Sequence, residues 1–371
     1  MSRPTYAEID LAALRHNCGV LRRRVGPGVR ILGVVKADGY GHGAVEAGRV
    51  MADAGIDMLG VAIVEEGVAL RVHGIRVPIL VMGLTPEDEV AAAIEYGLTP
   101  TVDGPATAEP LERRAAARGA TLAVHLKIDT GMNRLGVRAE EAAEAARAVA
   151  SFPHLSVAGA YTHLACADDP DDAVSAGQLA RFAEALTALR SAGVRPEVAH
   201  AANSSALLRS GESHFDMVRA GLALYGVAPC VAARDVPLRP VMSLVTHVVA
   251  TKRVRPGEGA SYGHRWRAAR ESVLGVLPIG YADGYPRALS DRARVRAGGH
   301  LAPVVGAVCM DMVLVDLTDV AEAAPGMAVT LIEADPASPL SAAALATAAG
   351  TIPYEILTGI GKRVPRVYRG G

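Results

Sequence analysis

Short apolar segments alternate with longer helical patterns between residues 30 and 226, and this alternation restricts the possible folds more than any other feature of the sequence. The helical patterns include residues 43–55, 87–97 and 178–193, and the last two end in the glycine that is typical of a helix C-terminus. The candidate strands are the eight apolar segments 30–36, 58–64, 78–83, 98–102, 121–129, 155–164, 197–204 and 216–226. Strands that alternate with helices in this way predict an α/β fold, a (β/α)8 TIM barrel.

The pattern changes after Tyr225, where residues 228–240 contain three prolines and no periodicity. The residues that follow form short β-branched segments at 241–254, 272–284, 302–317 and 328–334, broken by glycine and proline. These segments predict a mainly antiparallel β C-terminal domain. We expect the barrel domain to span residues 9–230 and the β domain residues 236–371, with residues 1–8 extended and joined to the β domain. Asp10 is the expected N-cap of the first helix.

Charge and spacing patterns exclude several classes of function. The chain has 38 basic and 39 acidic side chains, and a formal net charge of −1 gives no overall field for nucleic acid or a membrane surface. No apolar stretch reaches the ~18 residues of a membrane span, and the first ten residues lack the pattern of a secretion signal. The four distant cysteines and the eleven histidines show no metal-binding spacing. We therefore expect a cytoplasmic protein with a small-molecule partner and no metal.

Polar side chains stand at the carboxyl ends of several predicted strands, the face that forms the active site in barrels of this kind. They are Lys36, Asp129, His163, Asn203 and Arg219, with Arg134 just beyond Asp129. Loops are polar in any case, but the strands behind these residues are apolar, and the convergence predicts an active site.

Lys36 is the first candidate for chemistry, because only four of the 38 basic residues are lysines and arginine does not release its proton. A lysine at a strand end more often extends its ammonium group into solvent, and this is the alternative interpretation. At the rim of an apolar barrel, partial burial lowers the pKa of a lysine and suits it to Schiff-base formation with an aldehyde cofactor.

Two regions are candidates for binding phosphate. Gly39, Gly41 and Gly43 suggest a dinucleotide loop, although their spacing is GxGxG rather than GxGxxG, and Tyr40 between them offers a phenol to a phosphate oxygen. Barrels commonly bind phosphate after their seventh and eighth strands, where segments 203–205 and 220–222 lie. Asn203 and Ser204 are equally suited to cap the helix that follows them.

Nine motifs occur together and in order: KADGYGHG (36–43), KIDTGMNRLG (127–136), YTHLACAD (161–168), HAANSSA (200–206), VRAGLALYG (218–226), ASYGHRW (260–266), PIGYADGYPR (278–287), VCMDM (308–312) and TIPYE (351–355). On these motifs the chain resembles the alanine racemases, which are pyridoxal 5′-phosphate (PLP) enzymes with an N-terminal barrel and a C-terminal β domain. The resemblance covers nearly the whole chain. It implies interconversion of L-alanine and D-alanine by a homodimer with shared active sites, which supplies D-alanine for peptidoglycan.

The resemblance also implies roles for individual residues. Lys36 would bind the cofactor and act as the base on the D-alanine face, and Tyr262 would reach the site from the other subunit as the base on the L-alanine face. Arg134 and the Met310 backbone would bind the substrate carboxylate, and Lys127, which is carbamylated in many relatives, would hold Arg134. The remaining cofactor contacts would be Tyr40, Ser204, Gly221, Leu222 and Tyr354 around the phosphate, Arg219 at the pyridine nitrogen, His163 and His200 around Arg219, and Asn203 beside them.

These roles suit the chemistry. Racemisation removes an α-proton from one face and returns one to the other, so two bases must flank the cofactor. Arginine does not release a proton to the pyridine nitrogen, and the weaker electron sink that results disfavours transamination. Two alternatives remain: a decarboxylase of basic amino acids, which would usually place a carboxylate where Arg219 stands, and a PLP carrier, which would lack the second domain.

Overall fold

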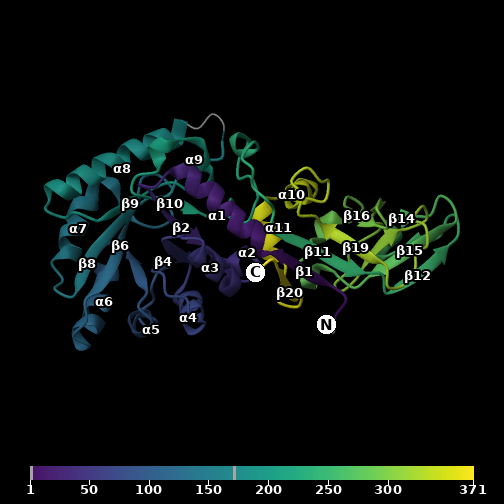
Figure 1. Ribbon diagram of the computed structural model, residues 1–371, viewed down its shortest axis with the longest axis horizontal. Coiled ribbons are helices and arrows are strands. Elements are labelled where there is room, and N and C mark those ends of the chain that lie inside the picture. The colour runs from purple at the N-terminus through teal and green to yellow at the C-terminus, as the bar shows by residue number, and fades with distance from the viewer. Residues whose placement is uncertain (1–2, 170–172) are drawn as a thin grey trace.

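Eight parallel strands close into a barrel in the N-terminal part of the computed structural model, which describes residues 3–169 and 173–371 (Figure 1). The strands, in barrel order, are β2 (Arg30–Val34), β3 (Met58–Val61), β4 (Ile79–Leu84), β5 (Thr99–Val102), β6 (Leu122–Asp129), β8 (Leu155–Tyr161), β9 (Val198–His200) and β10 (Met217–Ala220). The barrel closes because β10 pairs in parallel with β2, and a short strand β7 (Val137–Arg138) adds to β6 outside the ring. The predicted barrel is confirmed.

Helices surround the barrel and cover its apolar strands (Figure 1). They are α1 (Leu11–Val25), α3 (Ala44–Asp53), α4 (Val64–Val72), α5 (Val90–Glu95), α6 (Pro105–Ala117), α7 (Ala142–Ala150), α8 (Ala173–Ser191) and α9 (Ser204–Arg209). Each of the eight predicted strands is present, but most end a few residues earlier than the apolar segments suggested. The difference arises because apolar residues such as Leu222 and Leu224 continue the core into the loops at the barrel mouth.

The C-terminal part is mainly antiparallel, as predicted. A six-stranded sheet has the order β17 (His300–Pro303), β16 (Arg294–Ala297), β19 (Ala328–Ile332), β11 (Met242–His247), β1 (Tyr6–Asp10) and β20 (Arg366–Arg369). Two smaller sheets contain β12 (Ala250–Val254), β15 (Ser272–Leu277) and β18 (Val313–Asp316), and β13 (Gly259–Ala260) with β14 (Trp266–Arg267). Two helices, α10 (Ala342–Ala349) and α11 (Pro353–Gly359), precede β20, and α11 was not predicted.

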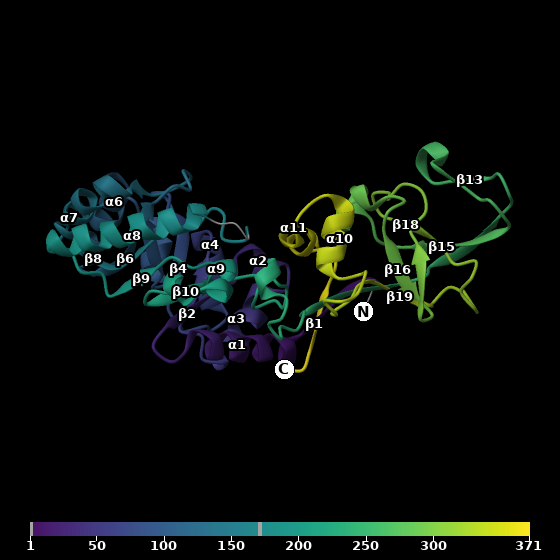
Figure 2. The same ribbon diagram turned by 90° about the horizontal axis from the view of Figure 1, so that it is seen from above.

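The first and last strands of the chain lie side by side at the junction of the two parts (Figures 1 and 2). Strand β1 pairs antiparallel with β11 and parallel with β20, which places the first residues in the distant sheet. Asp10 then caps α1, and its Oδ1 accepts a hydrogen bond from the Ala13 N–H at 2.9 Å. Asp10 is therefore both the last residue of strand β1 in the β sheet and the cap of the first helix of the barrel.

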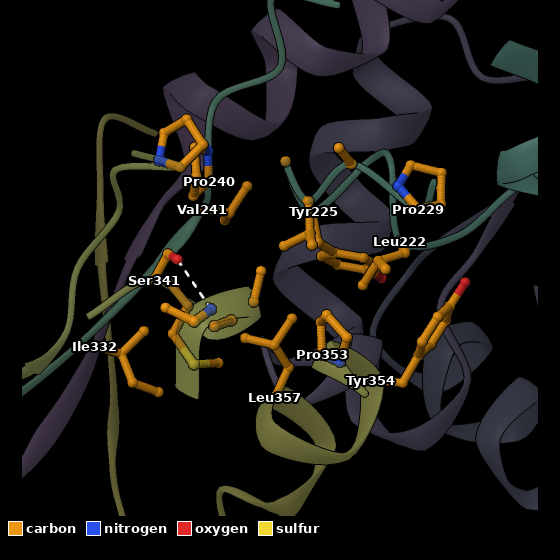
Figure 3. Close-up of a pocket in the computed structure, with 18 of the residues that line it drawn as sticks. Leu222, Tyr225, Pro229, Pro240, Val241, Ile332, Ser341, Pro353, Tyr354 and Leu357 are labelled. Carbon is orange, nitrogen blue, oxygen red and sulfur yellow. Dashed lines mark hydrogen bonds between the residues drawn. The ribbon is translucent and has the colours of Figure 1, made fainter. Parts of the chain in front are cut away.

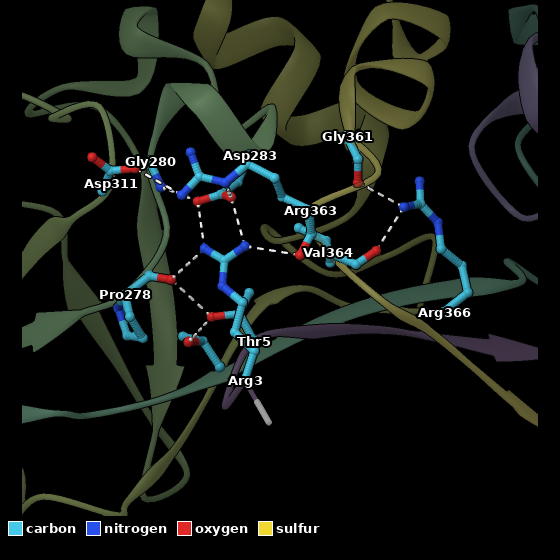
Figure 4. A network of polar contacts seen from close by, with 11 residues as sticks. Arg3, Thr5, Pro278, Gly280, Asp283, Asp311, Gly361, Arg363, Val364 and Arg366 are labelled. Atoms are coloured by element: carbon cyan, nitrogen blue, oxygen red, sulfur yellow. Dashed lines mark hydrogen bonds and ion pairs between the residues drawn. The ribbon is translucent and has the colours of Figure 1, made fainter. Parts of the chain in front are cut away.

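A polar network fixes the N-terminal segment to the β domain (Figure 4). The Arg3 guanidinium donates to both carboxylate oxygens of Asp283, at 2.7 and 2.8 Å. Burial alone would raise the pKa of Asp283, but the hydrogen bonds from Arg3 and from the Gly280 N–H lower it. Arg363 contacts Asp283 at 3.2 Å and donates to Asp311 at 2.7 Å. Through Asp311, the network thus extends to the loop that contains Met310, one of the predicted site residues.

One apolar core runs across the junction, from residues of β2 and α1 to residues of β11 and α11. A second core fills the side of the barrel around β6, α7 and α8. Within the described residues, no helix is both long and apolar enough to cross a membrane. The predicted domain boundaries remain a prediction.

Candidate active site

Lys36 begins a left-handed turn at the end of β2. Ala37, Asp38 and Tyr40 have φ angles of 51°, 54° and 54°, a conformation that costs a residue with a side chain about 1 to 2 kcal/mol. The turn is held by distant groups, because Glu66 accepts the Ala37 N–H at 2.6 Å and Arg366 donates to the Gly41 carbonyl at 2.9 Å. The conformation directs Lys36 and Tyr40 to the barrel mouth from one short segment.

The glycines of this segment serve packing rather than dinucleotide binding. A Cβ atom on Gly41 would lie 2.2 Å from the Leu357 carbonyl oxygen of α11, and one on Gly43 would lie 1.9 Å from the Tyr368 hydroxyl of β20. Both positions therefore need glycine so that the C-terminal segment can press against the turn. The GxGxxG fingerprint belongs to an open, doubly wound sheet, and the sheet here is a closed barrel.

Arg219, at the end of β10, is buried and surrounded by neutral acceptors. Its Nη1 donates to the ring Nδ1 of His200 at 3.0 Å, and its Nη2 contacts the ring Nδ1 of His163 at 3.1 Å. It also donates to the carbonyls of Thr162, His200 and Ala201. Among the described residues it has no carboxylate partner, and no acceptor contacts its Nε–H. One N–H of a buried guanidinium is therefore free for a ligand.

The histidines around Arg219 are held neutral. Burial, followed by the charges of Arg219 and Lys127, lowers the pKa of His163 to about 2. Burial, followed by Arg219, lowers the pKa of His200 well below its usual range and that of His125 to about 4. The guanidinium therefore remains the charged group of this cluster, although burial lowers its own pKa to about 10.

Lys36, Lys127, Arg134 and Arg219 make the barrel mouth cationic. Burial and the charge of Arg134 lower the pKa of Lys36, and burial with Arg219 and Arg134 lowers that of Lys127 well below its usual range. None of the four forms an ion pair within residues 3–169 and 173–371. Such a site suits anionic groups, and its two lysines are poised to lose their protons.

The residues predicted to bind phosphate lie together on the other side of the mouth. The Gly221 N–H donates to Ser204 Oγ at 2.8 Å, and a Cβ atom on Gly221 would lie 2.7 Å from the Tyr40 hydroxyl. The rings of Tyr40 and Tyr354 are 5.7 Å apart, and neither hydroxyl has a hydrogen-bond partner among the described residues. Backbone N–H and hydroxyl donors therefore converge on one place.

A cavity of about 950 Å³ adjoins this cluster, between the barrel mouth and helices α10 and α11. Figure 3 shows Leu222 and Tyr354 among its lining residues, with Tyr225, Pro353 and Leu357 around them. Burial raises the pKa of Tyr354 to about 12, so its phenol remains a hydrogen-bond donor at neutral pH.

Asn203 does cap the helix that follows it. Its Oδ1 accepts the N–H groups of Ser205 and Ala206, each at 3.1 Å. The cap fixes the start of α9, where Ser204 is buried against the Gly221 backbone.

Tyr262 and Met310 lie in the β domain and not at the barrel mouth. Their side chains are 72% and 53% exposed, and with Ser261, Cys309 and Met312 they surround a shallow hollow. Backbone hydrogen bonds fix the loop that contains Met310, since the N–H groups of Tyr281 and Ala282 donate to the carbonyls of Cys309 and Met310. The structure thus brings the barrel residues together and leaves these two apart.

Sequence reasoning missed two groups that shape the site. Glu66 holds the start of the turn, and Tyr161 lies beneath Lys127, whose Nζ is 4.2 Å from the ring centroid. His125 and Lys127 are two residues apart on β6 and face the same side, a spacing that could have indicated a polar layer inside the barrel.

Comparisons with known proteins agree with this geometry. The model of the alanine racemase N-terminal domain matches residues 9–229, and that of the alanine racemase C-terminal domain matches residues 241–368. Alanine racemase of Desulfovibrio desulfuricans is 44% identical, over 99% of this chain and 98% of that protein.

Solved structures give the same result. Alanine racemase from Streptomyces lavendulae is 40% identical, with a TM-score of 0.95 over 100% of this chain and 98% of that one. Alanine racemase from Bartonella henselae, solved with covalently bound pyridoxal phosphate, is 29% identical, with a TM-score of 0.88 over 99% of both chains. The chain belongs to the alanine racemase family.

Proposed function

We propose that the protein interconverts L-alanine and D-alanine with PLP, and that Lys36 and Tyr262 exchange the α-proton on opposite faces. The observation that supports this most directly is the cationic barrel mouth, where a lysine of lowered pKa lies near a buried arginine with no carboxylate partner among the described residues. Bound PLP would withdraw electrons from the α-carbon of the amino acid, which makes its α-proton acidic enough to remove.

The residues present fit that cofactor. Tyr40, Ser204, the backbone of Gly221 and Leu222, and Tyr354 would hold its phosphate. The three hydroxyls and the Leu222 N–H have no acceptor among the described residues, whereas the Gly221 N–H donates to Ser204 Oγ. The free Nε–H of Arg219 would meet the pyridine nitrogen. Arg219 would keep its proton at neutral pH, because burial lowers its pKa only to about 10. Proton exchange at the α-carbon is then favoured over transamination.

Lys36 is suited to hold the cofactor and to act as the base on the D-alanine face. Burial and the charge of Arg134 lower its pKa, which favours the unprotonated amine, the form that attacks a carbonyl and accepts a proton. Glu66 and the left-handed turn fix the backbone beside it, which limits the positions that the amine can take.

Arg134 is suited to bind the substrate carboxylate. It is exposed at the mouth and has no ion-pair partner among the described residues. The neighbouring Lys127 repels it while protonated, but the lowered pKa of Lys127 favours a neutral amine, which is the form that reacts with carbon dioxide. Carbamylated Lys127 would instead attract Arg134 and hold it in place.

Tyr262 completes the site from a second subunit. Its high exposure on the β domain, together with that of Met310, leaves both residues available to another copy of the chain. In the symmetric homodimer that we propose, Tyr262 would act as the base on the L-alanine face, and the Met310 backbone would bind the substrate carboxylate. The protein would act in the cytoplasm and supply D-alanine for peptidoglycan.

Incubation of the purified protein with PLP and a panel of amino acids tests the activity. We expect loss of optical rotation from L-alanine and from D-alanine, without release of carbon dioxide. Carbon dioxide release would indicate the decarboxylase alternative, which is disfavoured because Arg219 stands where such an enzyme would usually place a carboxylate. A dimer that binds PLP but racemises no amino acid would contradict the proposal and favour a carrier.

A further inference from the structure

A line of three hydrogen-bonded side chains runs from Arg219 into the barrel. Arg219 Nη1 is 3.0 Å from His200 Nδ1, and His200 Nε2 is 3.0 Å from His125 Nδ1. His200 stands on β9 and His125 on β6, 75 positions apart in the sequence. The proposed reaction assigns no task to His125, which is buried beneath the site.

The direction of each hydrogen bond in this line follows from one fact. A guanidinium has only donors, so His200 Nδ1 must accept the bond from Arg219. A neutral imidazole has one protonated nitrogen, so the proton of His200 lies on Nε2 and is donated to His125 Nδ1. His125 must then have its own proton on Nε2. The reverse order would leave His200 without any ring proton.

The surroundings hold both rings in this arrangement. The Tyr161 ring is stacked on His200, with centroids 4.7 Å apart and planes 4° from parallel. Gly159 lies opposite His125, and a Cβ atom there would come within 2.5 Å of the His125 Nδ1 atom. Burial lowers the pKa of both histidines, so each ring is neutral at neutral pH and has a single ring proton.

We propose that His125 is a positioning residue: it accepts the His200 Nε2 proton and thereby fixes the tautomer whose Nδ1 lone pair holds the Arg219 guanidinium toward the cofactor ring. This rests on the proposed function only for its effect on the cofactor. The tautomer itself is a property of the chain alone.

Nitrogen-15 NMR of the histidine rings tests the tautomer directly, in the protein with and without PLP. The His200 signals are assigned by their disappearance in His200→Asn. We expect Nε2 to be of the protonated type and Nδ1 of the unprotonated type in both forms. A protonated Nδ1 in the wild-type protein would overturn the proposal, whether or not the protein racemises alanine.

A matched pair of variants tests the role of His125. His125→Asn places an amide oxygen where Nδ1 stands and keeps an acceptor, whereas His125→Leu keeps the bulk and removes it. We expect His125→Leu to shift the His200 proton toward Nδ1, to change the visible absorption of the bound cofactor and to lower kcat about tenfold or more, with KM for alanine little changed. His125→Asn should retain the wild-type tautomer and most of kcat.

Two further variants separate this role from a merely structural one. Gly159→Ala should displace the His125 ring and reproduce the spectral change of His125→Leu, which keeps the test available if the leucine variant does not fold. His154→Asn removes a histidine that pairs with Glu112 on the barrel exterior and should alter none of these measurements. Wild-type tautomer, spectrum and kcat in both His125→Leu and Gly159→Ala would overturn the proposal.

Discussion

The two halves of the proposed active site differ in how completely one chain builds them. In the barrel half, Arg219 is 4% exposed and Lys127 6% exposed, and hydrogen bonds from several strands fix their surroundings. In the β-domain half, Tyr262 is 72% exposed, and its phenol has no hydrogen-bond partner among the described residues. The barrel interior fixes its charged groups with contacts from the same chain. An exposed tyrosine has no such contacts, and we expect it to act in catalysis only when it packs against another surface. On the proposed function, one chain therefore supplies only part of each site.

The largest effect should come from the barrel half. Lys36→Ala removes the amine that we propose binds PLP and accepts the proton, so we expect loss of the visible absorption band of the bound cofactor and of all racemisation. Lys252→Ala, on an exposed position of β12, is the matched control and should keep both. A Lys36→Ala protein that retained the band would show that another group binds the cofactor.

The next effect should come from the β-domain half. Tyr262→Phe removes one proton-transfer group and should lower kcat by about 10²- to 10⁴-fold. In deuterated water, α-proton exchange from L-alanine should fall more than exchange from D-alanine, because Lys36 still serves the other face. Tyr96→Phe, at the end of α5, should change neither rate. Equal losses for both enantiomers would contradict the assignment of two bases.

Acid should destabilise the barrel half in particular. Burial lowers the pKa of His42 and His125 to about 4 and that of His163 to about 2, and it holds that of His200 far below its usual range. The unfolded chain binds protons at these histidines below pH ~6.5 and the folded chain does not, so stability is highest above that pH and falls as pH decreases.

Each of the four histidines should remove up to about 1.4 kcal/mol per pH unit from the free energy of unfolding below pH ~6.5. Urea titrations at pH 7.5 and pH 5.5 measure the change. An equal free energy of unfolding at the two pH values would show that the buried histidines are already protonated in the folded chain.

The smallest effect should come from the phosphate side of the barrel mouth. Gly221→Ala places a Cβ atom 2.7 Å from the Tyr40 hydroxyl and must displace it, so we expect PLP affinity to fall about tenfold, a loss of about 1.4 kcal/mol. Gly28→Ala, where a Cβ atom would meet nothing within 4 Å, should leave the affinity unchanged. If Gly221→Ala bound PLP with wild-type affinity, the predicted contact between Tyr40 and the phosphate would be wrong.

The sequence predicts the regular parts of the fold well. Eight apolar segments gave eight barrel strands, because a strand covered on both faces needs a continuous apolar run. The cap at Asp10 and the glycine after α5 were also predicted, since local hydrogen bonding and backbone conformation decide them. Helix α11 was missed because its seven residues are too short to show a period.

The site was harder to predict where it depends on distant contacts. Nothing in the residues Ala37 and Asp38 indicates a left-handed turn, which exists because Glu66 and Arg366 hold it from far along the chain. The contact between His125 and His200 joins strands that no local pattern relates. Asn203 was suited to two tasks, and only the helix start beside it showed that it is a cap.

Mixed dimers of two inactive variants test the shared site most directly. Lys36→Ala and Tyr262→Phe are expressed together with different tags, and the activity of the mixture is compared with that of each variant alone. If Tyr262 serves the Lys36 of the other subunit, each mixed dimer has one intact site, and random pairing should restore about one quarter of wild-type activity. If both residues of a site came from one chain, every site would lack one of them, and no activity above that of the two variants would contradict the account.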